Sequence, residues 1–435
     1  MRGRNFPPTP GRLDRVTTLI DRPVTEEAPG RHQKPVTWGI RILLSLAVTY
    51  GCLYLLWPAL RPVTIDTRVY RAAGGWLLHG KPLYEVGLYG TQDLPFNYPP
   101  FAALLFSPLA ILPGSFALML FTVVNLAIVP LVVWRLLRAM GRRADHTLIA
   151  ITAVASVALF CTEAVFNSVV IGQINLVLLA LVVFDLVRTT PSRWQGVGIG
   201  VAAAIKLTPL LFIAYLVFTR RFRAAAVATG TFAGTILIGF LIAPGSAVSF
   251  WFGGVIGDPA RITAAGLASG GNMSVMGWLL RCGLTEGTAR LVWMAGGAAL
   301  GIAVLWVAAQ AHRRGWTAMA IGLLGSCCCA LSPFSWDHHW VWLLLIAVQL
   351  MHAGLRRRVT PWLLLVPFLL LSMRIEWSQW WNDNGLLALF VLALIGTAAA
   401  VLVRPAGSGA ELTDGLGDLG DGGGQRRDRL HQVTQ

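Results

Sequence analysis

Charged residues are scarce in this sequence. They make up 13% of 435 residues, whereas soluble globular proteins carry about a quarter. Three catalytic motifs are also missing: the P-loop for nucleotide phosphates, the HExxH helix of metallopeptidases, and an acidic DxD triplet for a metal-bound nucleotide sugar. These absences argue against a soluble enzyme, nucleotide hydrolysis, metal-dependent proteolysis and a nucleotide-sugar donor.

The cysteines do not form a disulfide or metal-binding framework. The six cysteines form no CxxC pair and lie in or beside apolar segments, where cysteine serves as a small buried hydrophobic residue. The cysteines therefore predict no metal site, and no motif in the sequence indicates a cofactor.

Long apolar stretches are abundant instead. Hydrophobic residues make up 55% of the chain, and the mean hydropathy is +0.64. Runs long enough to cross a bilayer core of roughly 30 Å cover residues 38–57, 115–134, 169–187, 224–243, 291–311 and 385–403. The sequence predicts an all-α, polytopic membrane bundle over residues 38–403, with about ten to twelve transmembrane helices, some of them broken or re-entrant.

The net charge of +15 comes from basic residues in the two tails and in short stretches between the apolar runs, such as 135–143, 220–223 and 356–358. Loops of this kind face the cytoplasm and its anionic lipids, so we expect a membrane partner and no nucleic acid. Residues 1–37 and 404–435 are poor in bulky apolar groups and are predicted to be disordered cytoplasmic tails. Because residues 38–57 begin late, we expect an uncleaved anchor there.

Residues 196–218 do not fit a simple crossing. They lie between two basic loops, and Lys206 and Pro209 interrupt them. We expect two half-helices in a re-entrant hairpin, or alternatively one irregular span. Lys206 would contact a lipid phosphate, either as part of a site or by extending to a headgroup.

With residues 1–37 in the cytoplasm, carboxylates, amides and histidines collect on the outer face. Asp66 follows the first apolar run there, and apolar residues at helical spacing after it predict an interfacial helix. A single carboxylate can act as the base of an inverting glycosyl transfer, because a phosphate leaving group needs little protonation. Asp66 is therefore the candidate catalytic base, with helix capping at the membrane surface as the alternative.

The most distinctive motif is Ser332-Pro-Phe-Ser-Trp-Asp-His-His-Trp340. Adjacent histidines project differently and have no matching partner cluster, so a metal site is not expected. An interfacial belt accounts for the tryptophans, whereas a histidine at this depth can donate to a phosphate or hold a carboxylate. We predict a catalytic role for His338 and substrate binding by Trp336, Asp337 and His339.

Other polar and aromatic residues complete the predicted substrate site. They are Tyr70, Tyr84, Asn97, Tyr98, Glu163, Gln173, Asn175, Lys206, Asn272, Arg374 and Glu376. The amides suit sugar hydroxyls but also suit helix capping. The pair Arg374 and Glu376 could equally neutralise one another.

Several motifs over residues 60–385 carry a family resemblance. They are Asp66 with Val69-Tyr70, Gly80-Lys-Pro-Leu-Tyr84, Phe96-Asn-Tyr-Pro-Pro100, Pro108-Leu109, Gly172-Gln-Ile-Asn175, Lys206-Leu-Thr-Pro209 and Ser332 to His339. Together they resemble the actinobacterial polyprenol-phosphate-mannose-dependent mannosyltransferases, glycosyltransferase family 87 of the GT-C superfamily.

This resemblance implies a bacterial inner-membrane enzyme that uses polyprenyl-phosphate-mannose from the periplasmic side. It implies an inverting transfer that forms an α-1,2 linkage on a phosphatidylinositol mannoside, or a related transfer to lipomannan or lipoarabinomannan. Asp66 occupies the position of the family's base. Lys206, Arg374 and one of His338 and His339 would then hold the donor phosphate.

A transporter or flippase for lipid-linked sugars is the alternative function. Broken helices and an intramembrane lysine suit such a protein. Its usual inverted repeat is not evident in the sequence, which favours the transferase.

Overall fold

Helices build the part of the chain that the structure describes. This computed structural model describes residues 64–403 except 86, 88–93, 189, 191, 259–260, 262–265, 357–358, 374 and 376–377. Those residues contain no strand, only an isolated bridge between Thr162 and Met373, which confirms the all-α class. The predicted tails 1–37 and 404–435 and the apolar run 38–57 lie outside the described residues.

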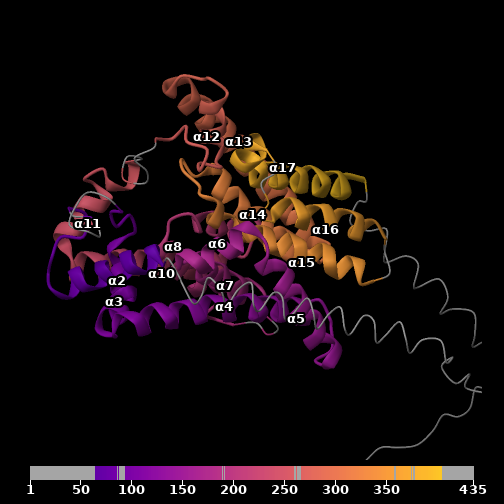
Figure 1. Cartoon of the computed structure of the whole chain (residues 1–435), viewed down its shortest axis with the longest axis horizontal. Coiled ribbons are helices and arrows are strands. Elements are labelled where there is room, and N and C mark those ends of the chain that lie inside the picture. Colours follow the sequence, from indigo (N-terminus) through magenta and orange to yellow (C-terminus); the bar gives the residue numbers. More distant parts are fainter. Residues whose placement is uncertain are drawn as a thin grey trace, which may run out of the picture. The chain divides into compact units, whose positions relative to one another are not determined.

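Figure 1 labels most of the described helices. The first ten are α2 (Ile65–Leu78), α3 (Pro100–Ile111), α4 (Gly114–Ala139), α5 (His146–Phe160), α6 (Glu163–Ile171), α7 (Asn175–Leu186), α8 (Val197–Ile205), α9 (Leu210–Phe218), α10 (Phe222–Ile242) and α11 (Pro244–Trp251). The others are η2 (Val255–Gly257), α12 (Val275–Arg281), α13 (Glu286–Arg313), α14 (Thr317–Leu331), η4 (Asp337–Trp342), α15 (Leu343–Gly354), α16 (Val359–Ser372) and α17 (Gln379–Val403).

Four of the described helices are long and apolar enough to cross a membrane: α4, α10, α13 and α17. They confirm the predicted runs 115–134, 224–243, 291–311 and 385–403. A fifth span is formed only if α6 and α7 are counted together. The expected ten to twelve spans are therefore not confirmed. The helix predicted after Asp66 is present as α2.

The prediction of one continuous span over residues 169–187 is wrong. The chain bends by 115° between α6 and α7, because Gly172 takes a left-handed conformation with φ 73° that ends α6. A second break confirms the two half-helices expected in residues 196–218. Lys206 is extended there, and Pro209 precedes α9.

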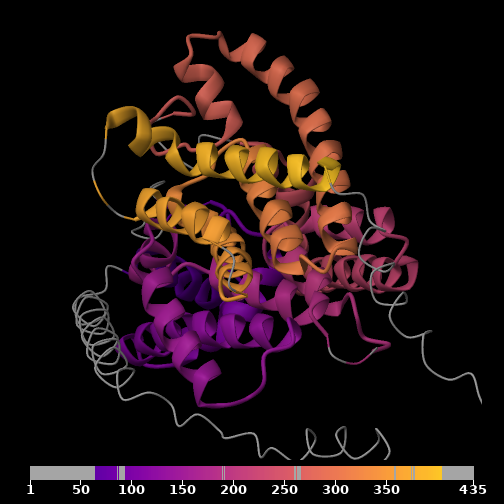
Figure 2. The same ribbon diagram turned by 90° about the vertical axis from the view of Figure 1, so that its right-hand side faces the viewer.

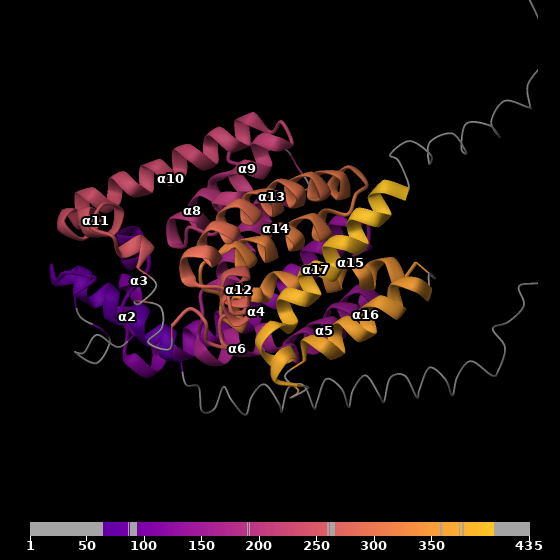
Figure 3. The same ribbon diagram turned by 90° about the horizontal axis from the view of Figure 1, so that it is seen from above.

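The contacts divide the described helices into two neighbourhoods. In the first, α2 packs on α3, α4 on α5 and α7, and α8 on α7 and α10. In the second, α14 contacts α13, α15 and α17, and α16 contacts α15 and α17, as Figures 2 and 3 show. The short helix η4 contacts α6, α7, α14 and α15, so it joins the two neighbourhoods.

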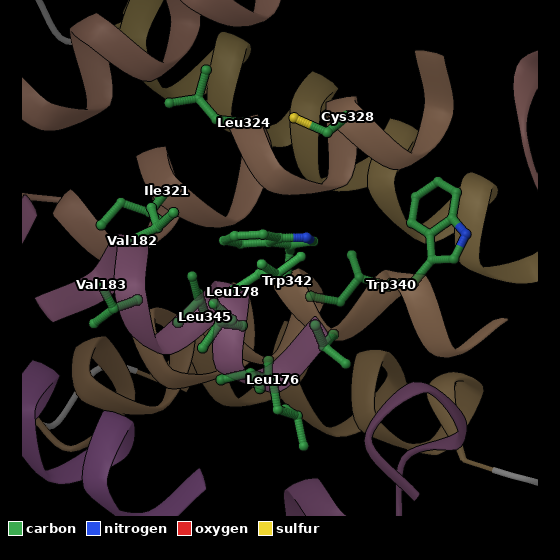
Figure 4. Close-up of a cluster of buried hydrophobic side chains, with 14 of the residues drawn as sticks. Leu176, Leu178, Val182, Val183, Ile321, Leu324, Cys328, Trp340, Trp342 and Leu345 are labelled. Carbon is green, nitrogen blue, oxygen red and sulfur yellow. The ribbon is translucent and has the colours of Figure 1, made fainter. Parts of the chain in front are cut away.

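Trp342 of η4 lies at the centre of that junction. Figure 4 shows its ring between Leu324 and Cys328 of α14 on one side and Leu178 of α7 on the other. A Cβ at Gly325 would lie 2.0 Å from the Trp342 ring, so only glycine lets α14 approach so closely. The junction holds η4, which carries His338 and His339, against α6 and α7.

Candidate active site

The first turn of α2 docks on the bend between α6 and α7. The backbone N–H of Thr64 donates to the Val170 carbonyl at 3.0 Å, and the Thr67 hydroxyl donates to the Gly172 carbonyl at 2.9 Å. A Cβ at Gly172 would meet the Thr67 hydroxyl oxygen at 2.0 Å. Glycine is therefore needed at this position for its backbone conformation and for the close approach of α2. The contact brings Asp66 to Gln173.

Gln173 connects Asp66 to two tyrosines. Its amide nitrogen donates to Asp66 Oδ2 at 3.0 Å, and its amide oxygen accepts from the Tyr70 hydroxyl at 2.8 Å. The Tyr70 and Tyr98 hydroxyls lie 3.1 Å apart. The backbone N–H of Ile174 also donates to the Gln173 amide oxygen at 3.0 Å. These bonds fix which end of the Gln173 amide faces the Asp66 carboxylate.

The histidine motif is anchored by its backbone. The His338 carbonyl accepts hydrogen bonds from the Ser168 hydroxyl and the Asn175 amide, each at 2.9 Å. The His338 Nδ1 lies 3.1 Å from Asp337 Oδ1, and Asn167 donates to the other oxygen of that carboxylate. Asp337 therefore favours a proton on Nδ1 and leaves Nε2 of His338 for another partner.

Lys206 reaches the same region from the break between α8 and α9. Its ammonium donates to Asn175 Oδ1 at 3.2 Å, so Asn175 bonds both Lys206 and the His338 carbonyl. Lys206 and His338 both interact electrostatically with Asp66. The structure thus brings an acid, a lysine and a histidine together from α2, the 206–209 break and η4.

The surroundings set the charge of these groups. Burial raises the pKa of Asp66, although His338, Lys206 and the Gln173 hydrogen bond act in the opposite direction. Burial alone would raise the pKa of Asp337, but the bonds from His338 and Asn167 hold it below its usual value. Burial, Lys206 and His338 lower the pKa of His339, which favours its neutral form. Asp66 is the carboxyl group suited to receiving a proton.

Two predicted substrate residues, Tyr84 and Asn97, use their side chains to bond backbone carbonyls. The Tyr84 hydroxyl donates to the Tyr98 carbonyl at 2.8 Å, and the Asn97 amide donates to the Arg261 carbonyl at 2.9 Å. Arg261 in turn donates to the Tyr84 carbonyl at 2.7 Å. Sequence reasoning did not select Arg261, which no motif marks.

Asn272 is fully buried, and its amide is already engaged within the protein. It donates to the Leu267 and Pro333 carbonyls at 2.9 and 3.0 Å and accepts from the backbone N–H groups of Ser274 and Ser335. Asn272 therefore holds the segment before Trp336 in place. A direct contact with substrate would require these bonds to be exchanged.

Of the other predicted residues, Trp336 and His339 lie against the His338 ring. The Trp336 ring stacks on His338, with 6.3 Å between ring centres, and the His339 ring lies edge-on to His338 at 4.8 Å. Glu163 begins α6. Arg374 and Glu376 lie outside the described residues, so their predicted role in substrate binding is not tested.

Sequence reasoning missed Ser168 and Asn125 as supports of the site. Asn125 is fully buried in the apolar helix α4 and donates to the Gln173 carbonyl at 3.1 Å. A polar residue inside an apolar span is an available signal for such a role. Within the described part of the chain, no three potential metal ligands of the His, Cys, Asp and Glu types come together.

Comparison with known proteins identifies the family of this chain. The sequence signature of Glycosyltransferase family 87 matches residues 96–333. The chain is 33% identical over 353 residues to the polyprenol-phosphate-mannose-dependent alpha-(1-2)-phosphatidylinositol mannoside mannosyltransferase of Mycobacterium tuberculosis, covering 76% of this chain and 80% of that protein. It is 34% identical over 353 residues to the Mycolicibacterium smegmatis protein of the same name, covering 74% and 77%.

A relative with a different acceptor in its name is almost as similar. The polyprenol-phosphate-mannose-dependent alpha-(1-2)-phosphatidylinositol pentamannoside mannosyltransferase of Mycobacterium tuberculosis is 31% identical over 366 residues, covering 78% of this chain and 83% of that protein.

Proposed function

The chain belongs to glycosyltransferase family 87 and is a mannosyltransferase, and from that premise we propose that it moves mannose from polyprenyl-phosphate-mannose to a phosphatidylinositol mannoside. The names of the similar proteins support both the donor and the acceptor class. We place the reaction on the periplasmic side of the bacterial inner membrane, in accord with the prediction that the arginine-rich loops face the cytoplasm.

Support for Asp66 as the general base comes from its neighbours. It lies within reach of Gln173, while Lys206 and His338 act on its charge. Its raised pKa suits a group that must receive a proton during the reaction. The other nearby carboxylate, Asp337, is bonded to His338 and Asn167 and is therefore a poorer base.

The chemical step follows from these roles. The acceptor hydroxyl oxygen attacks the anomeric carbon of mannose while Asp66 takes the hydroxyl proton. The bond from that carbon to the phosphate oxygen breaks on the opposite face, and its electron pair leaves with the polyprenyl phosphate. Attack from the opposite face inverts the configuration, so a β-linked donor gives an α-linked product, and attack by a 2-hydroxyl of the acceptor makes that linkage α-1,2.

In this reaction Lys206 and the Nε2 of His338 would receive the leaving phosphate. Preorganised cations and hydrogen-bond donors stabilise developing negative charge without rearranging during the reaction. Asn175 orients Lys206, and Asp337 orients the His338 ring. Because its lowered pKa favours the neutral form, His339 would contribute a hydrogen bond instead of a charge.

The decisive experiment replaces Asp66 by asparagine. Full-length protein in detergent would be given radiolabelled mannosyl phosphoryl polyprenol and a phosphatidylinositol mannoside. Asp66→Asn should reduce turnover by roughly 10²–10⁴-fold, the usual contribution of a general base, with donor binding retained. Asp145→Asn is the matched control, because Asp145 caps α5 through Leu148 and asparagine caps equally well.

Asp66→Asn with full turnover would remove Asp66 as the base. A folded wild-type protein that transports the lipid-linked sugar without forming product would contradict the transferase function itself. The similarity to the pentamannoside enzyme favours a second acceptor of the same class. Offering tetramannoside and pentamannoside lipids in parallel would identify which one is extended.

A further inference from the structure

A cavity of about 440 Å³ lies between α2 and the C-terminal end of α3. Its lining residues Arg71 and Gly75 follow Asp66 by five and nine residues, which turns them roughly 140° and 180° away from Asp66 around α2. The cavity therefore opens on the side of α2 that faces away from the candidate active site. Its chemistry is carried by Arg71, Trp76, Leu78, His79, Lys81 and Ile111.

The polar part of this lining is basic. Arg71, His79 and Lys81 contribute to it, and none of the described residues that line it is acidic. Arg71 uses one terminal nitrogen to donate to the Ala110 and Leu112 carbonyls at 3.5 and 3.2 Å, while its Nε is buried without a partner. His79 uses Nδ1 on the Gly75 carbonyl at 2.7 Å, which leaves Nε2 available. The three side chains suit an anion.

The rim of the same cavity is apolar. The Leu78 side chain is 52% exposed and that of Ile111 is 75% exposed, and the half-buried Trp76 lies beside them. A soluble anion would gain nothing from these groups. A phospholipid would gain from both parts, because its phosphate can pair with the basic residues while its acyl chains cover Leu78 and Ile111.

We propose that this cavity binds the phosphate headgroup of a resident anionic phospholipid, drawn from the bilayer and separate from the glycolipid acceptor. The separation follows from the direction of the cavity, which faces away from Asp66. The bound lipid would fill the space between α2 and α3, and so support the helix that carries Asp66. This proposal does not depend on the reaction that the protein catalyses.

Native mass spectrometry of the full-length protein tests the proposal. Protein in neutral detergent would be titrated with phosphatidylglycerol and, separately, with phosphatidylcholine. Wild type should retain phosphatidylglycerol preferentially. Lys81→Glu should weaken that retention about fivefold or more, because each basic charge near a lipid phosphate contributes about that factor. Ala72→Phe, which fills the cavity without changing its charge, should also weaken it.

Arg68→Glu is the matched control. Arg68 is an exposed residue of the same helix and does not line the cavity. It should leave phosphatidylglycerol binding unchanged. Equal losses in Arg68→Glu and Lys81→Glu, or no loss in Lys81→Glu and Ala72→Phe, would overturn the proposal and leave only general surface attraction. The melting temperature of each variant would show that it is folded.

A second readout separates the bilayer lipid from the acceptor. For a resident lipid, Lys81→Glu should leave the KM for the mannoside acceptor unchanged when phosphatidylglycerol is saturating. A raised acceptor KM together with full phosphatidylglycerol retention would overturn the proposal and assign the cavity to the acceptor's own phosphate. Lipid retention is measured without turnover. The lipid site can therefore be disproved while the proposed transferase function holds, and the transferase function can be disproved while the lipid site holds.

Discussion

At the scale of single residues, the charge of Asp66 depends on its neighbours. Burial favours the protonated carboxyl, and Lys206, His338 and Gln173 favour the carboxylate. Only the carboxylate can accept the acceptor's proton, so activity should fall as pH drops through the raised pKa of Asp66. Removing a neighbour that favours the carboxylate should raise this pKa further.

Lys206→Gln tests this dependence. The substitution removes the positive charge but keeps a group that can bond to Asn175. We expect the acidic limb of the pH profile of kcat/KM to move to higher pH, because Lys206 lowers the pKa of Asp66. Arg223→Gln, at an exposed residue at the start of α10, should leave the profile in place. An unmoved acidic limb in Lys206→Gln would contradict electrostatic support of Asp66.

Some residues of the site could be predicted from the sequence and others could not. Asp66, Gln173, Asn175, Lys206 and His338 were predicted and lie together. Their residue types suit proton transfer and phosphate binding, which single motifs can indicate. The bond from Gln173 to Asp66 joins residues 107 positions apart, and no local pattern encodes it. The same limit applies to Asn272, because only the fold reveals that its amide is occupied.

At the scale of helices, the α6–α7 bend determines where Asp66 lies. Gly172→Ala should destabilise the protein and reduce transfer, since the new Cβ would meet the Thr67 hydroxyl and the left-handed conformation costs about 1 kcal/mol for a non-glycine residue. The measurement is the melting temperature in detergent together with turnover.

Gly80→Ala separates the cost of the left-handed backbone from the clash of the new Cβ with a neighbour. Gly80 also has a positive φ, of 64°, but its Cβ would have open space. This control should show the backbone cost alone and nearly full turnover. If Gly172→Ala behaved like Gly80→Ala in both measurements, the close approach of α2 to the bend would not be required.

The start of α8 depends on the buried carboxylate of Asp185. Asp185, at the end of α7, accepts from the backbone N–H groups of Gly196 and Ile199 at 2.9 and 3.1 Å through Oδ2, and from Arg188. Asp185→Ala should lower stability by more than the typical ~1 kcal/mol of an exposed N-cap, because it strands buried N–H groups. Asp145→Ala, at an exposed cap of α5, supplies that smaller reference in the same melting experiment.

At the scale of the whole molecule, the length of the apolar runs predicted the four long spans but did not predict the bend between α6 and α7. The runs near α4, α10, α13 and α17 were predicted because hydropathy over twenty residues is a property of composition. Hydropathy does not record a left-handed glycine, so residues 169–187 looked continuous. The break at Lys206 and Pro209 was foreseen because a charge and a proline interrupt an apolar run.

A short apolar helix that crosses a bilayer deforms the lipid around it. The helix α16 has 14 residues, which is about 21 Å, against a hydrocarbon core of roughly 30 Å. Its Val359 and Leu363 are exposed by 71% and 67%. A bilayer adjusts to such hydrophobic mismatch by thinning locally. If α16 crosses the bilayer, turnover should vary with acyl-chain length in reconstituted vesicles, because thinner bilayers would bring a lipid-borne phosphate deeper, toward Lys206.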